Sequence, residues 1–145
     1  MIFEGVANAS YTKSKILVDS VPLSAEASDD MTMVPKYNFY IALDQAINIG
    51  GHEGYVRIDA SGYGESKSHF RAKDTDISPA YTTFNMAIGA DITEGATLSL
   101  HVQNMFNQEV ILYKRQRYGR DWSLGPRHNY YGAERTISLR LDIQY

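Results

Sequence analysis

Apolar and polar residues alternate along most of this chain with a period of two, whereas a helical period is hard to find. Such alternation is typical of a β-strand that has one apolar face and one polar face. Six segments show the pattern, and they cover residues 3–12, 34–47, 55–61, 83–92, 97–103 and 136–145. The sequence therefore predicts an all-β protein with six long strands.

The links between these strands differ in length in a regular order. Residues 48–52 and 93–95 form short turns that contain glycine, whereas residues 15–33, 65–80 and 108–134 form long polar links. In an antiparallel meander, this order places the long links at one end of the sheet and the tight turns at the other. Outer-membrane β-barrels show the same asymmetry.

Alternation alone fits either a soluble β-sheet protein with its apolar face inside or a membrane barrel with that face outside. Most of the strands reach the ~9–11 residues that a membrane strand needs, and soluble strands are usually about 5–6 residues long. Charged residues also occupy mid-strand positions on the polar faces, namely Asp44, Arg57, Asp59, Arg140 and Asp142. Charges there suit a water-filled lumen, so the pattern favours an antiparallel transmembrane β-barrel meander. A soluble β-sheet binding module is the alternative.

Composition narrows the classes of function. A length of 145 residues allows one domain, and 43% hydrophobic with 21% charged residues is ordinary for a folded protein. The formal net charge of −3 gives no whole-molecule reason to expect nucleic acid as a partner. The chain has no cysteine, which excludes a disulfide scaffold, a CxxC zinc site and a thiol nucleophile. Tyrosine dominates the aromatic residues, and it suits strands and water–lipid boundaries.

No catalytic constellation emerges from the sequence. The histidines at positions 52, 69, 101 and 128 are scattered, and none has the partners of an HExxH motif. No nucleophile and base stand in a recognisable arrangement. We therefore expect neither an enzyme nor a bound cofactor or metal.

The last long link combines basic and aromatic residues. Its candidate contact residues are Lys114, Arg115, Arg117, Arg120, Trp122 and Arg127. Guanidinium groups could bind an anionic ligand such as a ferric chelate, or pair with the phosphates of lipopolysaccharide. Similar clusters bind nucleic acid, but an extracellular loop argues against that role. The structural alternative is a loop folded on itself, with arginines over aromatic rings.

Three segments, taken in order, carry a family resemblance. Residues 98–107 end in Asn104-Met105-Phe106-Asn107, and residues 135–145 run from Arg-Thr through alternating apolar positions to a final tyrosine. Upstream, Val-Pro-Lys-Tyr at residues 34–37 precedes a strand. Together they resemble the end of a TonB-dependent outer-membrane receptor, whose penultimate strand commonly ends in an Asn-Leu-Phe-Asp-like sequence.

The resemblance implies a place within a larger machine. Residues 1–145 would form about six C-terminal strands of a barrel of the 22-stranded type, with the plug domain and signal peptide absent. The partners would be outer-membrane lipid, the remainder of the barrel and plug, and an inner-membrane energy-coupling complex. The location would be the outer membrane of a Gram-negative cell, and the function would be import of a scarce nutrient such as a ferric siderophore. A small barrel closed by oligomerisation is the alternative.

The final strand carries a second resemblance. Its apolar positions, which end on an aromatic residue, are Ile137, Leu139, Leu141, Ile143 and Tyr145. This spacing resembles the signal that the barrel assembly machinery reads, and an edge strand is suited to strand addition. The alternative is that any lipid-facing strand alternates in this way.

Overall fold

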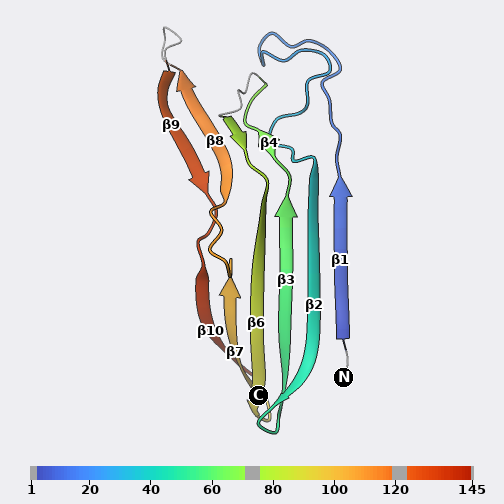
Figure 1. Cartoon of the computed structure of the whole chain (residues 1–145), viewed down its shortest axis with the longest axis vertical. Coiled ribbons are helices and arrows are strands. Elements are labelled where there is room, and N and C mark those ends of the chain that lie inside the picture. The colour runs from blue at the N-terminus through green and yellow to red at the C-terminus, as the bar shows by residue number, and fades with distance from the viewer. Residues whose placement is uncertain (1–2, 71–75, 119–123, 145) are drawn as a thin grey trace.

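The computed structural model describes residues 3–70, 76–118 and 124–144, with the side chains of 116–118 and 124 excepted. Six strands form one antiparallel sheet, and each pairs with the one before it in the sheet (Figure 1). In order across the sheet they are β1 (Phe3–Tyr11), β2 (Tyr37–Ile49), β3 (His52–Tyr63), β6 (Tyr81–Thr93), β7 (Ala96–Gln103) and β10 (Thr136–Ile143). The predicted all-β meander of six main strands is confirmed.

The ends of the sheet differ as the link lengths predict. The β2–β3 and β6–β7 turns lie together at one end, and the long links lie at the other (Figure 1). Gly50, Gly51 and Gly95 have φ values of 61°, 92° and 82° in these turns. Such positive values favour glycine, and this explains why these residues allow such short connections.

Two of the long links contain strands that the sequence pattern did not predict. In one link the short strands β4 (Ser66–Lys67) and β5 (Ile77–Ser78) pair with each other. In the other, β8 (Ile111–Tyr118) and β9 (Leu124–Tyr131) form a longer hairpin. The long polar link predicted over residues 108–134 is present between β7 and β10, and much of it forms this hairpin. The register of the hairpin shifts between Ile111 and Tyr113 and again between Gln116 and Tyr118. These shifts interrupt the period of two on which the strand prediction depended.

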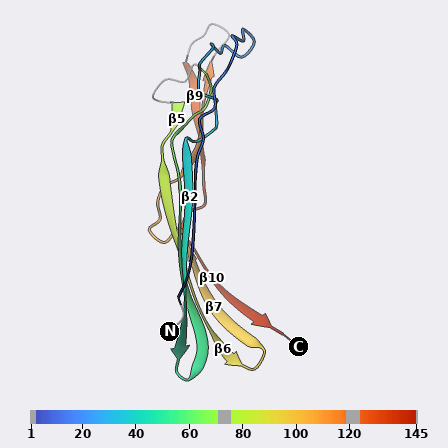
Figure 2. The same ribbon diagram turned by 90° about the vertical axis from the view of Figure 1, so that its right-hand side faces the viewer.

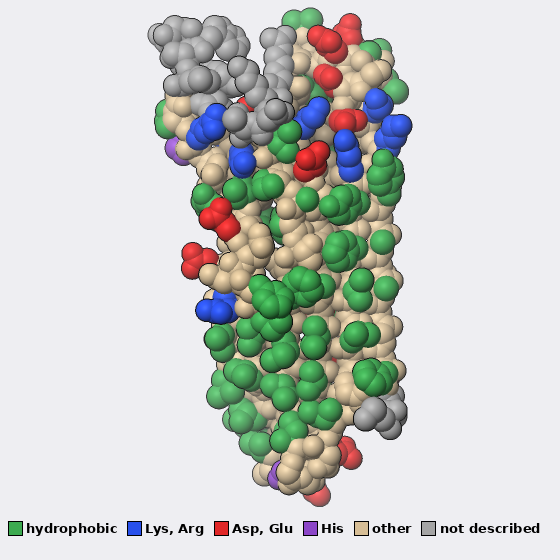
Figure 3. All heavy atoms as spheres, in the orientation of Figure 1, with side chains coloured by type: hydrophobic (Ala, Val, Ile, Leu, Met, Phe, Trp, Pro, Cys, Tyr) green, Lys and Arg blue, Asp and Glu red, His purple; other side chains and the backbone are tan. Residues whose placement is uncertain are grey.

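The sheet is a single layer whose apolar face stays uncovered (Figure 2). Neighbouring strands match their apolar residues in rows, for example Leu43, Ile58, Met86, Val102 and Ile137. In the described part of the chain no large side chain is fully buried, and Leu43 remains 53% exposed. Figure 3 shows the hydrophobic side chains gathered over this face, below a zone of charged residues. No helix in the described residues is long and apolar enough to cross a membrane.

Candidate functional site: a polar sheet face and a basic hairpin

The polar face of the sheet holds a connected set of charged and hydroxyl side chains. Arg57 on β3 donates from Nη1 to the Asp44 carboxylate at 3.2 and 3.3 Å, and from Nη2 to the Tyr40 hydroxyl at 2.9 Å. Asp44 and Arg57 stand directly opposite each other on paired strands, which explains why they meet. Of the mid-strand charges predicted for the polar face, Asp44 thus pairs with Arg57, and Arg140 pairs with Asp142 at 2.7 Å.

A second polar contact links β3, β6 and the end of β7. Asn85 donates to Asp59 at 2.7 Å, and its side-chain oxygen accepts the backbone N–H of Asn104 at 3.0 Å. Ser61 and Thr83 form a further hydroxyl pair at 3.1 Å. This face can therefore hold water or a polar ligand, whereas the opposite face presents hydrocarbon.

The Asn104–Asn107 segment, one carrier of the family resemblance, forms a tight turn. Asn104 and Asn107 have φ values of 48° and 52°, a region that asparagine tolerates better than most residues. The Asn104 side chain is buried and accepts from the Gln108 N–H at 2.9 Å. It also donates to the carbonyls of Gln108 at 2.8 Å and Ala133 at 3.1 Å.

Asn107 connects the beginning and the end of the link between β7 and β10. Its side-chain oxygen accepts the backbone N–H of Arg135 at 2.9 Å, immediately before β10 begins. The Phe106 side chain is exposed and contacts the Phe84 ring edge-to-face, with ring centroids 5.3 Å apart. The turn therefore ties the start of β10 to the end of β7. The segment is recognisable in the sequence by resemblance, but this physical role depends on contacts that only the folded sheet makes.

The β8–β9 hairpin separates the basic residues that the sequence grouped together. Lys114 pairs with Asn129, and Gln116 with Arg127, so Lys114 and Arg127 share one face of the hairpin. Arg115 pairs with His128 and lies on the other face. That second face also carries Tyr113 and Tyr130, whose ring centroids are 5.7 Å apart.

Several predicted residues cannot be placed on either face. Arg120 and Trp122 lie outside the described residues, and the side chain of Arg117 does too. Tyr145, the last residue of the expected assembly signal, is also outside the described part of the chain. The remaining four positions of that signal follow β10 along the apolar face and are exposed, namely Ile137, Leu139, Leu141 and Ile143.

The described residues contain no group of three or more His, Asp or Glu side chains that could hold a metal ion. His101 lies on the polar face and is 2.9 Å from the Ser99 hydroxyl through Nε2. The partner of the His101 ring is therefore a neighbouring hydroxyl group on the same strand.

Two solved structures share the fold described above. The ferric yersiniabactin uptake receptor FyuA from Yersinia pestis matches 99% of this chain with a TM-score of 0.80 and 17% identity. The ferric-catecholate import receptor Fiu from E. coli K12, in its closed form, matches 99% of the chain with a TM-score of 0.71 and 13% identity. The fold is that of part of a TonB-dependent receptor barrel.

The chain spans about a fifth of the receptors it matches, 21% of FyuA and 19% of Fiu. At these identities the likeness concerns the receptor-barrel fold. No protein-family model matches the sequence, and no curated protein matches it. By their names, the two similar structures belong to import receptors rather than enzymes.

Proposed function

We propose that this chain is part of the wall of an outer-membrane receptor that imports a scarce nutrient such as a ferric siderophore. The observation that supports this most is the two-faced sheet, which matches a receptor barrel over 99% of the chain. In that setting the apolar face meets lipid and the Asp44–Arg57 face lines the lumen. The remaining barrel, the plug, the barrel assembly machinery and an inner-membrane energy source would be the partners.

Membrane placement is tested first, because the whole proposal depends on it. These 145 residues contain no cysteine, so a single cysteine introduced here can carry a fluorophore once any cysteine elsewhere in the receptor has been replaced. In the native protein, reconstituted in vesicles with a nitroxide-labelled lipid, a label at Ile58→Cys should be strongly quenched. The control Ser61→Cys lies three residues along β3 on the polar face and should be quenched much less. Equal quenching at both positions would refute the membrane-wall assignment.

Import is tested separately in whole cells. Deletion of the gene should abolish uptake of one chelate from a panel of radioiron siderophores, and the intact gene should restore it. Uptake that is unchanged after deletion, across the whole panel, would leave the fold assignment intact and remove the transport proposal.

The β8–β9 hairpin is the proposed ligand contact within this receptor. Lys114 and Arg127 share a face, so the double variant Lys114→Gln/Arg127→Gln should raise the half-saturating chelate concentration by about tenfold, as charge-assisted bonds are lost. Arg115→Gln tests the other face of the hairpin, which carries another of the predicted contacts. Unchanged uptake in all three positions would favour a purely structural hairpin.

A further inference from the structure

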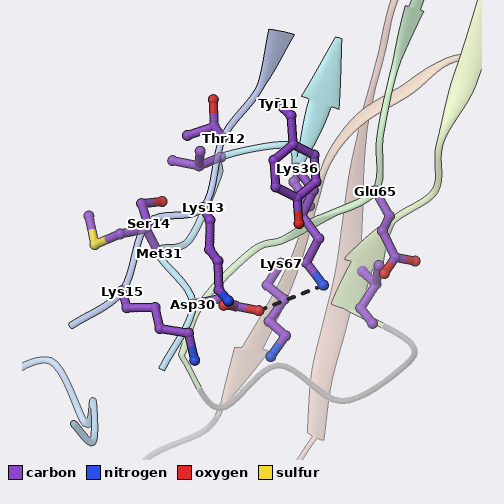
Figure 4. Close-up of a pocket in the computed structure, with 13 residues that line it drawn as sticks. Tyr11, Thr12, Lys13, Ser14, Lys15, Asp30, Met31, Lys36, Glu65 and Lys67 are labelled. Carbon is purple, nitrogen blue, oxygen red and sulfur yellow. Dashed lines mark ion pairs between the residues drawn. The ribbon is translucent and has the colours of Figure 1, made fainter. Parts of the chain in front are cut away.

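Four lysines surround one pocket at the long-link end of the sheet. The pocket has a volume of about 250 Å³ and lies between the β1–β2 link and the β4–β5 pair. Lys13, Lys15, Lys36 and Lys67 line it together with the carboxylates of Asp30 and Glu65. Figure 4 shows the four labelled lysine side chains gathered around the Asp30 carboxylate. Segments distant in the sequence thus bring an excess of positive charge to one place.

The carboxylates leave part of this charge without a partner. Lys36 pairs with Asp30 at 3.7 Å, and Lys15 donates to the carbonyl of Ser28 at 3.1 Å. Among the described residues, neither Lys13 nor Lys67 forms an ion pair or side-chain hydrogen bond. Two ammonium groups are therefore available to an anion that enters the pocket.

The location of the pocket indicates what kind of anion would reach it. Tyr11 and Tyr37 are paired at the ends of β1 and β2, on the apolar face, and Tyr11 is 73% exposed. Lys13 follows two residues beyond Tyr11, and in Figure 3 basic side chains lie directly above the apolar zone. Exposed tyrosines followed by lysines, beyond a hydrocarbon-facing band, are typical of the level at which lipid headgroups lie.

We propose that this lysine pocket binds the phosphate groups of an anionic lipid in the surrounding leaflet. The proposal rests on the membrane placement proposed above. Ammonium groups act as point charges toward phosphate, and clustered lysines beside a membrane surface strengthen the attraction. The Asp30 carboxylate pairs with Lys36 and repels an anionic ligand. It therefore lowers the affinity of the pocket for phosphate.

Binding is measured on the native receptor in detergent, with bisphosphorylated lipid A in mixed micelles as the probe. Phosphatidylcholine serves as the zwitterionic control lipid, and inorganic phosphate serves as the free anion. Replacement of all four lysines by glutamine should weaken lipid A binding at least tenfold. Replacement by arginine should preserve it, and Asp30→Asn should strengthen it because one opposing charge is removed.

The outcomes separate the sources of phosphate and the two proposals. Unchanged lipid A binding in the glutamine variant would overturn the inference, and so would displacement by inorganic phosphate at the same concentration. Lipid quenching at Ile58→Cys should persist in the glutamine variant, since the lysines lie beyond the apolar band. Loss of quenching in the unsubstituted protein would instead refute the membrane placement. The Asp30→Asn variant changes affinity in the opposite direction, so a general folding defect cannot mimic the expected pattern.

Discussion

Glycines and aromatic rings face each other across neighbouring strands at two points of the sheet. Phe39 on β2 stands opposite Gly62 on β3, and Tyr55 on β3 stands opposite Gly89 on β6. In each pair the aromatic ring occupies the space above the glycine, and a Cβ added to the glycine would collide with the ring. Such rings cover the gap that the glycine leaves in the strand surface.

The Tyr55–Gly89 pair gives a prediction about packing. A Cβ at Gly89 would lie 2.5 Å from the Tyr55 ring and 3.1 Å from the Ser99 Cβ, so both neighbours must move. Gly89→Ala should therefore lower the free energy of unfolding by about 1–3 kcal/mol. The measurement is denaturant unfolding of the native protein in detergent, followed by circular dichroism.

A double variant shows whether the ring is the cause. Tyr55→Ala alone should destabilise the protein through lost packing. In the Tyr55→Ala background, Gly89→Ala should cost clearly less than it does alone, because the colliding ring is gone. Strictly additive effects would show that the ring is not what limits substitution at Gly89.

Asn104 allows backbone conformation to be separated from side-chain hydrogen bonding. Asn104→Gly keeps access to the positive φ of 48° but removes three side-chain bonds, and Asn104→Ala removes both advantages. Each lost bond is worth about 1 kcal/mol, and a left-handed alanine costs a further ~1–2 kcal/mol. We expect the stability order Asn, Gly, Ala in thermal unfolding of the native protein. Equal stability of the asparagine and alanine proteins would contradict the assigned role.

At the scale of elements, the main strands were predictable because one simple rule generates them. A strand with lipid or apolar surroundings on one side and water on the other must alternate, and β2, β6 and β10 all do so. The β8–β9 hairpin does not follow the rule, because its register shifts twice and it carries charges on both faces. Its existence depends on cross-strand pairing, which a local pattern does not encode.

The candidate site likewise divides into residues that a local pattern places and contacts that depend on register. Parity along the strands places Arg57 and Asp44 on the polar face, but their ion pair depends on the β2–β3 register. Composition groups Lys114 with Arg127, and only the hairpin register places them on one face, with Arg115 on the other. The lysine pocket joins Lys13 to Lys67 through chain links that have no periodic signal.

The last strand, β10, supports a prediction about assembly. Leu139 is 70% exposed on the apolar face and stands opposite Leu100, whereas Ser138 stands opposite His101 on the polar face. In the proposed membrane placement Leu139 faces lipid, where a charge costs up to about 2–4 kcal/mol at the bilayer midplane and less toward the interfaces. Leu139→Arg should therefore reduce the amount of folded protein in the outer-membrane fraction several-fold. The measurement is an immunoblot of that fraction, with Ser138→Arg as the adjacent control that should assemble normally. Equal losses for the two variants would point to a sequence requirement independent of the face.

At the scale of the whole molecule, the sheet has two free edges. Across the described residues β1 pairs only with β2, and β10 pairs only with β7. In hydrocarbon, each backbone group without a hydrogen-bond partner costs several kcal/mol, so an open sheet is unfavourable there. Closure of six strands on themselves would give a barrel narrower than the ~8-stranded size at which side chains already fill the interior. The polar network around Arg57 and Asp59 would have to fit into that smaller space.

These edges predict how the 145-residue chain behaves when it is produced alone. Refolded in detergent, it should form a mixture of oligomers, because pairing between copies satisfies the backbone groups of β1 and β10. Co-refolding with the other strands of a receptor barrel should remove these species, since the edges then pair within one barrel. Sedimentation in detergent distinguishes the two states, and circular dichroism reports the sheet content. A homogeneous folded monomer of 16.3 kDa would show that the six-stranded sheet closes by itself, and would favour a small independent barrel over a receptor wall.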